Sequence, residues 1–332
     1  MASPLVSVII PVFNRGEILT KTVESVATQT YPNVEIIIVD DGSTEDIETI
    51  VQDLRPRVRF PMHYIRQENS GPGVARRTGL ENARGEFIQY LDSDDEILSE
   101  KIELQVEMML ANPQSVMCYT IAINDNNNGS RTTRKFSNLP ADDLLSTALQ
   151  YRRWGTPSCL WRYPDKAVAR WSNLYNGEDV VHDVTVGIQH REILFLPKAL
   201  TIIKKANGQL SEVPKDQARF ERYKSDIFSV NVLSYHALET SGLHRNPGYA
   251  EPLAERFYFI GLKLAKMGDV ERAIASLRYV SLLSRKPLRT LETVMASLAI
   301  RLTKARSPSL YHLLFRVHRK LVSPYVHCYR TV

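Results

Sequence analysis

The sequence predicts an α/β fold, with a mostly parallel, Rossmann-like sheet followed by an α-helical extension at the carboxyl terminus. Three observations predict it. The first 125 residues alternate short β-branched apolar runs with segments of helical period, polar loops follow the runs, and beyond residue 213 the apolar spacing is helical throughout. Buried strands separated by helices of this length are typical of a parallel sheet with right-handed crossovers. We therefore expect two regions, residues 1–213 and residues 214–332.

Each element expected in the first region rests on its hydrophobic period. Residues 6–11 and 35–40 are continuous apolar, β-branched runs, which indicates strands buried on both faces. Residues 17–27 instead place their apolar side chains at helical spacing. By the same criteria we expect further strands at 62–66, 86–92 and 116–123, and further helices at 47–54, 73–83 and 98–110.

Beyond the predicted parallel strands, the sequence pattern is first typical of a loop, then of a hairpin and finally of helices. Residues 125–134 are polar and rich in turn formers, which predicts a loop. Two apolar segments, 193–196 and 200–203, are expected to pair as a hairpin. Residues 257–267 and 270–283, separated by Gly268 and Asp269, are typical of an αα-hairpin. No second copy of this pair is visible, so a repeat array is not predicted.

Length, composition and cysteine spacing argue against a disulfide-linked secreted protein and against a membrane-spanning protein. The chain has 332 residues, 43% hydrophobic and 24% charged, which is ordinary for a globular protein. Its three cysteines, Cys118, Cys159 and Cys328, are far apart and have no metal-ligand spacing, which favours a reducing compartment. The amino terminus lacks a basic segment before its apolar run, and the run at 5–13 is about half of what a bilayer span needs. We therefore expect a cytoplasmic chain that does not cross a membrane.

Acidic side chains follow several of the predicted strands, at the edge of the sheet where parallel α/β folds bind ligands. Asp40 and Asp41 follow the second strand, and Asp92, Asp94 and Asp95 follow the fourth. Carboxylates placed so close together repel each other, and a divalent cation such as Mg²⁺ or Mn²⁺ resolves the repulsion. Each motif alone also fits a turn with a helix N-cap, so the prediction of a metal site depends on their pairing.

A glycine-containing segment at 69–79 opens the third expected helix. Glycines before a helix N-terminus allow backbone N–H groups to approach a phosphate. A dinucleotide-binding fingerprint would need glycine where Arg76 stands, and it would directly follow the first strand. The segment therefore indicates phosphate binding but disfavours a dehydrogenase.

Four motifs follow one another along the chain: Pro11-Val12-Phe13-Asn14, Asp40-Asp41-Gly42-Ser43, Asn69-Ser70-Gly71 with Ala75-Arg76 and Gly79, and Asp92-Ser93-Asp94-Asp95. Their order and spacing resemble those of family 2 glycosyltransferases of the GT-A fold. The resemblance is dense over residues 4–125 and thin to about 210. It implies inverting transfer of a sugar from a nucleotide-diphosphate donor, commonly a UDP-sugar, to a hydroxyl of a saccharide or lipid-linked acceptor. It also implies a divalent cation, Mn²⁺ or Mg²⁺, and a role in cell-surface polysaccharide or glycolipid synthesis.

The resemblance assigns roles to the loops. Asp41 would bond the base ring, Asp92 would lie near the ribose and the metal, and Asp94 and Asp95 would hold the metal on the diphosphate. Arg77 departs from the family, which often has Asn there. The residues expected to bind the donor are Pro11, Val12, Asn14, Asp40, Asp41, Gly73, Arg76, Asp92 and Ser93, and those expected to bind the metal are Asp92, Asp94 and Asp95.

Transfer to a hydroxyl also needs a general base, because a sugar hydroxyl is a poor nucleophile. The family places the base in a downstream Glu-Asp pair, which Glu178 and Asp179 match. We expect Asp179 to be the base, with Glu178 and Asp183 as rivals, although the pair also fits the start of a helix at 180–190. On the acceptor side the resemblance points to Trp154, Thr156 and Ser158, and Trp154 fits either sugar stacking or the core. Where many relatives carry a histidine after the last strand, this chain has Lys204 and Lys205.

An alternative reading is a catalytically degenerate transferase domain that serves as a binding or scaffold module through its helical tail. The intact acidic loops and the candidate base argue against it. Donor hydrolysis distinguishes the two readings.

The carboxyl-terminal region is strongly basic, with 15 Lys and Arg against 5 Asp and Glu from Glu251 to Val332. Apolar stripes at 291–302 and 310–322 lie beside basic residues, as in helices that rest on anionic membranes. The same stripes also fit packing on the catalytic region or on a second copy of the chain. Lipid-linked acceptors in the family favour a peripheral site on the inner face of the membrane. Nucleic acid is disfavoured, because the aromatic residues are not interleaved as stacking platforms.

Overall fold

The computed structural model describes residues 3–126, 130–163, 165–204 and 213–285. Contacts within the chain divide it into two compact units, Met1–Lys215 and Asp216–Val332. The first unit is built on one sheet with the strand order β3-β2-β1-β4-β8-β6-β9-β5, with β7 beside β6.

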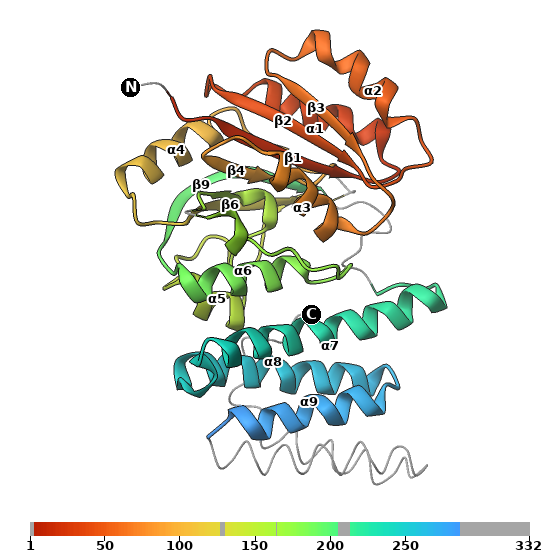
Figure 1. Ribbon diagram of the computed structural model, residues 1–332, viewed down its shortest axis with the longest axis vertical. Helices are drawn as coiled ribbons and strands as arrows, with labels where there is room; N and C mark the ends of the chain where they lie inside the picture. Colours follow the sequence, from red (N-terminus) through yellow and green to blue (C-terminus); the bar gives the residue numbers. More distant parts are fainter. Residues whose placement is uncertain (1–2, 127–129, 164, 205–212, 286–332) are drawn as a thin grey trace. The chain divides into compact units, whose positions relative to one another are not determined.

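The first four strands of the sheet are parallel, as the sequence predicts (Figure 1). The β-branched apolar runs of the first two strands along the chain are buried on both faces because helices cover both sides of the sheet. The strands are β1 (Val6–Val12), β2 (Val34–Asp40), β3 (Met62–Arg66) and β4 (Phe87–Tyr90). The helices between them are α1 (Gly16–Ala27), α2 (Ile47–Leu54) and α3 (Pro72–Asn82).

Beyond β4 the sheet is mixed. β8 (Cys159–Trp161) runs antiparallel to both β4 and β6 (Met117–Asp125), and β9 (Ile193–Lys204) runs parallel to β6. β5 (Glu96–Ile97) pairs antiparallel with the end of β9. The polar segment expected as a loop contains a short strand, β7 (Arg131–Thr133), that pairs with β6.

The prediction of a hairpin at residues 193–203 is wrong. The whole segment is one strand, β9, whose register against β6 shifts around Ile121. Thr120 pairs with Leu196 and Ile121 with Ala199, so Pro197 and Lys198, which lie between Leu196 and Ala199, bulge out. A Pro-Lys pair between two apolar runs has the composition of a turn, but the long edge of β6 keeps both runs in one strand.

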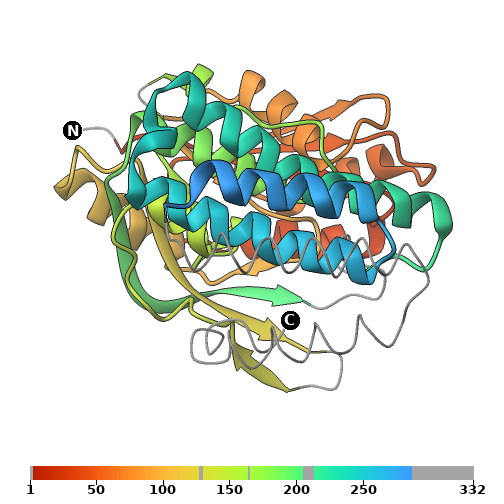
Figure 2. The same cartoon turned by 90° about the horizontal axis from the view of Figure 1, so that it is seen from below.

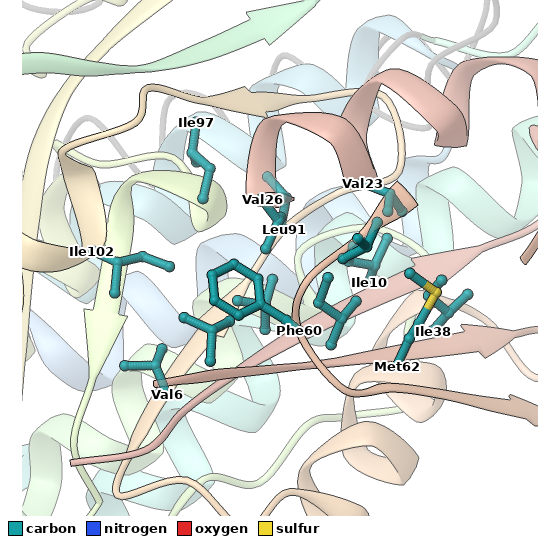
Figure 3. Packing of buried hydrophobic residues seen from close by; sticks show 14 of the residues in the cluster. Val6, Ile10, Val23, Val26, Ile38, Phe60, Met62, Leu91, Ile97 and Ile102 are labelled. Atoms are coloured by element: carbon teal, nitrogen blue, oxygen red, sulfur yellow. The ribbon is translucent and has the colours of Figure 1, made fainter. Parts of the chain in front are cut away.

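Alternating side chains of the strands divide the core between the two faces of the sheet. Val8 and Ile10 of β1 contribute to a cluster with α1, α2 and α4 (Lys101–Ala111), whereas Ile9 contributes to a cluster with α3. Figure 3 shows part of the first cluster, with Val23 and Val26 of α1 over the strands. The second cluster includes α5 (Leu144–Gln150) and α6 (Glu178–Gln189), which carries the predicted base. Packing of helices on both faces of the sheet therefore fixes the position of the edge from which the acidic loops extend.

The second unit is helical over residues 216–285, the part that the structure describes. The α-helices there are α7 (Gln217–Thr240), α8 (Pro247–Lys266) and α9 (Val270–Leu283), which Figure 2 shows side by side. The predicted αα-hairpin is present as α8 and α9, joined at Gly268, whose φ is +80°. The stripes predicted at 291–302 and 310–322 lie outside the described residues. None of the helices in the described ranges is long and apolar enough to span a bilayer.

Candidate functional site

The loops after β1 and β2 are joined by hydrogen bonds centred on two aspartates. Asp40 is fully buried, and its carboxylate accepts bonds from Ser43 N at 2.8 Å, Tyr64 Oη at 2.8 Å and Arg66 Nη1 at 3.1 Å. Asn14 N donates to Ser43 Oγ at 2.9 Å, which ties the two loops together. Asp40 therefore shapes the loop from inside. The N-cap of α2 is Asp46, so the Asp40–Ser43 motif does not cap this helix.

The carboxylate of Asp41 holds the segment that precedes α3. It accepts hydrogen bonds from Gln67 Nε2 at 2.8 Å, Ser70 N at 2.9 Å and Gly71 N at 2.8 Å. Its own backbone N–H donates to Val12 O at 2.9 Å. Two of the three donors to the carboxylate share Oδ1, so Oδ2 has an acceptor position left for a ligand donor.

Gly73 is explained by packing. A Cβ at this position would lie 2.0 Å from the carbonyl oxygen of Ser172, so only glycine lets α3 approach that backbone. Gly71, just before the helix, has a φ of +92° and lies against the ring of Tyr175. The structure thus gives these glycines a role within the protein, and the expected phosphate contact stays a prediction.

Arg76 connects the loop after β4 to the start of α6. Its Nη2 lies 2.5 Å from Asp92 Oδ1 and its Nη1 lies 2.7 Å from Glu178 Oε1. The guanidinium lies 4.9 Å from the centre of the Trp171 ring. The Arg76 side chain is 6% exposed and that of Asp92 is 33% exposed, so the ion pair opens to solvent on the Asp92 side. One arginine therefore brings together the predicted donor loop and the predicted base pair.

The other two aspartates of the loop are more buried. Asp94 pairs with Arg15, and Asp95 Oδ1 accepts a hydrogen bond from Lys204 N at 3.0 Å. Burial, and then the charge of Asp92, raises the pKa of Asp94. Burial followed by the charges of Asp92 and Asp94 raises the pKa of Asp95 well above its ordinary value.

The predicted metal site is not a preformed cage. Among the residues that the structure describes, no group of three or more His, Cys, Asp or Glu side chains is arranged to hold a metal ion. Mg²⁺ and Mn²⁺ at phosphate sites need only one or two carboxylates, because the substrate and water supply the other ligands. The raised pKa values of Asp94 and Asp95 mark a place where a cation would stabilise their charged forms, so the residues present fit such an ion.

The backbone of Ser93 belongs to the same loop. Its carbonyl oxygen accepts a hydrogen bond from Thr22 Oγ1 of α1 at 2.9 Å, and the residue is 5% exposed. Pro11 lies in β1 and pairs with Val39 of β2. Ser93 therefore presents little side-chain surface to a ligand, whereas Pro11 is partly exposed.

The three candidate bases all lie on the first turns of α6, in different surroundings. Asp179 has a side chain that is 25% exposed and pairs with Arg152. Glu178 is 9% exposed and pairs with Arg76. The side chain of Asp183 is 1% exposed, and its Oδ2 accepts bonds from Arg152 Nε at 2.6 Å and Trp154 Nε1 at 2.8 Å. Asp183 is therefore buried and occupied, and Asp179 is the most accessible of the three.

Their protonation differs as well. Burial raises the pKa of Glu178 to about 7, against the smaller opposing effect of Arg76. Burial also acts on Asp179, but the charges of Arg152 and then Arg76 outweigh it, and its pKa is lowered. Asp179 is thus the carboxylate that stays ionised.

The acceptor-side residues are interior. Trp154 is fully buried beside the ring of Tyr119, which favours the core over sugar stacking, the two alternatives that the sequence left open. Ser158 is also fully buried and donates to Gly155 O at 2.8 Å, and Thr156 is 9% exposed. Thr156 and Ser158 bound the short 3₁₀ helix η2 (Thr156–Ser158) before β8. All three hold this segment in place.

Sequence reasoning missed the arginines that pair with the acidic groups. Arg15 follows β1, and Arg152 precedes η2. Arg15 pairs with Asp94, and Arg152 pairs with Asp179 and Asp183. Their partners are 27 to 79 residues away in the chain, so no local spacing could have pointed to them.

The sequence profile described as Glycosyl transferase family 2 matches residues 7–169. The chain is 43% identical over 108 residues to TuaG of Bacillus subtilis, described as a teichuronic acid biosynthesis glycosyltransferase, which covers 32% of this chain and 42% of TuaG. It is 30% identical over 235 residues to the glycosyltransferase GlyA of Streptococcus pneumoniae, which covers 63% of this chain and 32% of GlyA. The chain therefore spans less than half the length of these relatives.

Solved structures share the fold. Residues 1–349 of Staphylococcus aureus TarS, in complex with UDP-GlcNAc, superpose with a TM-score of 0.67 at 21% identity, covering 95% of this chain and 92% of that one. The mannosyltransferase PcManGT of Pyrobaculum calidifontis, in complex with GDP-Man and Mn²⁺, gives 0.53 at 16% identity, covering 100% and 89%. The ordered motifs, the mixed sheet and these matches agree: residues 7–169 form a domain of glycosyltransferase family 2, with the GT-A fold.

Proposed function

We propose that this chain is an inverting, metal-assisted glycosyltransferase that moves a sugar from a nucleotide-diphosphate donor to a hydroxyl acceptor. The observation that carries the proposal is Arg76, which connects Asp92 of the donor loop to Glu178 at the start of α6. A chain used only as a scaffold would have no need to bring an acidic donor loop and an ionised, partly exposed carboxylate into one site.

The residues divide the work as follows. Asp41 has an acceptor position free for the base ring, and Asp92 is exposed enough to meet the ribose. Asp94 and Asp95, with Asp92, would hold a divalent cation, which supplies Lewis-acid stabilisation of the leaving diphosphate. Asp179 accepts the proton of the attacking hydroxyl as the bond between C1 and the diphosphate breaks. Attack from the face opposite the leaving group inverts the anomeric centre.

The choice of donor and acceptor class follows the relatives. The TarS structures are complexes with UDP-GlcNAc and with UDP, which supports a UDP-sugar as the first donor to test. The description of TuaG supports an acceptor in cell-surface polysaccharide synthesis. The Mn²⁺ in the PcManGT structure supports a divalent cation.

The proposal is tested with a panel of nucleotide sugars in the presence of Mn²⁺, by measuring release of nucleoside diphosphate with water as the acceptor. We expect release from one donor, and loss of that release in excess chelator. Binding without release from any donor, equal in the wild type and in Asp179→Asn, would favour the degenerate binding module.

A further inference from the structure

Arg152 joins two acidic residues of one helix. Its Nη1 pairs with Asp179 Oδ2, and its Nε lies 2.6 Å from Asp183 Oδ2. The two aspartates are four residues apart on α6, so they lie on the same face, one turn from each other. The Arg152 side chain is 11% exposed. The guanidinium is therefore a mostly buried bridge between the candidate base and the residue one turn behind it.

The side of the bridge away from the base is fixed by further bonds. Asp183 Oδ2 also accepts from Trp154 Nε1 at 2.8 Å, and Asp183 Oδ1 lies 2.9 Å from His182 Nδ1. The other ring nitrogen of His182 lies 2.8 Å from Tyr163 Oη. Because the Asp183 side chain is 1% exposed and has these three partners, it anchors Arg152.

We propose, resting on the function proposed above, that Arg152 is a positioning residue for the general base: anchored by Asp183, it holds the Asp179 carboxylate ionised and in one orientation. It acts on the reaction only through Asp179.

The charges around Asp179 support this role. Arg152 faces it from the segment before η2, Arg76 from α3 and Arg134 from the segment after β7, while Glu178 precedes it on α6. Burial raises the pKa of Asp179, and among the groups that lower it Arg152 has the largest effect. The adjacent Glu178 pairs with Arg76 instead, and its pKa is raised to about 7. The pKa values of these two neighbouring carboxylates are therefore shifted in opposite directions.

This arrangement predicts the effect of removing Arg152. A base must be deprotonated to accept a proton, so the acidic limb of the pH–rate profile reports its pKa. Without Arg152, burial raises the pKa of Asp179 and only the smaller effects of Arg76, the Val180 backbone bond and Arg134 oppose it. The acidic limb of the profile then moves to higher pH.

The test compares wild type with Arg152→Gln and Arg152→Lys. The readout is the pH dependence of kcat/KM for nucleoside diphosphate release from the donor that wild type hydrolyses fastest. We expect the acidic limb of Arg152→Gln to move up by about one pH unit or more, and that of Arg152→Lys by less, because lysine keeps the charge. Affinity for the nucleoside diphosphate should stay within about twofold. In an Asp179→Asn background, Arg152→Gln should cause no further loss of rate.

Two variants test the anchor. Trp154→Phe removes one of the hydrogen bonds that hold Asp183, so the acidic limb of its pH profile should move in the same direction as that of Arg152→Gln, but by less. Asp183→Asn weakens the anchor of Arg152, so the acidic limb of its pH profile should move in the same direction as that of Arg152→Gln. If Arg152→Gln does not fold, Asp183→Asn is the variant that tests the proposal.

A slower Arg152→Gln whose pH profile coincides with that of wild type would overturn the positioning role and leave the proposed function intact. Wild type that releases no nucleoside diphosphate from any donor would overturn both.

Discussion

At the scale of single residues, the candidate site consists of carboxylates held by arginines. Arg15 pairs with Asp94, Arg76 with Asp92 and Arg152 with Asp179. A buried carboxylate is costly unless it is paired or hydrogen-bonded, so each pairing makes the acidic side chain tolerable inside the fold. Asp92 and Asp94 could be predicted because they follow a strand, whereas Asp179, at the start of α6, is indicated only by the family resemblance. Their partners could not, because each arginine comes from a distant segment.

The role of Asp179 is tested by Asp179→Asn. The change keeps the shape of the side chain but removes the proton acceptor, so kcat should fall by about 10²–10⁴. Donor affinity, measured by calorimetry, should stay near the wild-type value. Wild-type turnover by Asp179→Asn together with loss of turnover by Glu178→Gln would transfer the role to Glu178.

Glu178 should make stability depend on pH. Folding raises its pKa from 4.5 to about 7, so the folded state binds its proton more tightly than the unfolded state does. The stability that this proton contributes is complete below pH 4.5 and is lost as the pH rises through 7. Between pH 5 and pH 8 the free energy of unfolding of wild type should therefore fall more steeply than that of Glu178→Gln, in which the amide oxygen still accepts a bond from Arg76. Parallel slopes from denaturant titrations would contradict the assignment.

At the scale of elements, the sequence predicts the first half of the sheet well. The runs that form β1 and β2 are β-branched, buried on both faces and flanked by the amphipathic helices α1 and α2, so local pattern and final environment agree. It fails for β8, which has three residues, and for β9, which contains Pro197. Those strands exist because β6 offers edges on both sides, a long-range condition that no local window contains.

The close contact at α3 gives a prediction about one element. Gly73→Ala places a methyl group 2.0 Å from the carbonyl oxygen of Ser172, so α3 must shift away from that segment. Arg76 moves with the helix, so we expect both a lower melting temperature and weaker nucleotide binding. Gly242→Ala is the control, because that glycine has a φ of +73° but no atom within 4 Å of the added Cβ. It should cost only the backbone strain, about 1 kcal/mol, and leave nucleotide binding unchanged.

At the scale of the whole molecule, all the predicted site residues fall in one unit. Both hydrophobic clusters and every candidate side chain lie within Met1–Lys215. A chain that ends at Lys215 should therefore fold and bind the nucleoside diphosphate with an affinity within a few-fold of the full chain. Calorimetry on both proteins measures this. Loss of binding in a fragment that still melts cooperatively would show that residues after 215 contribute to the donor site.

The bulge in β9 constrains how the chain length can vary. From Leu196 to Thr201 this strand advances five residues while β6 advances two, from Thr120 to Ala122. The extra residues of β9 determine the register of the part of the strand that follows the bulge. That part includes Lys204, whose backbone N–H donates to Asp95, and the residues that pair with β5. Removing one residue here would move the end of the strand by one position and turn its side chains to the opposite faces. Insertions and deletions in homologues should therefore avoid residues 197–204, although Pro197, Lys198 and Ala199 are exposed and would otherwise tolerate them.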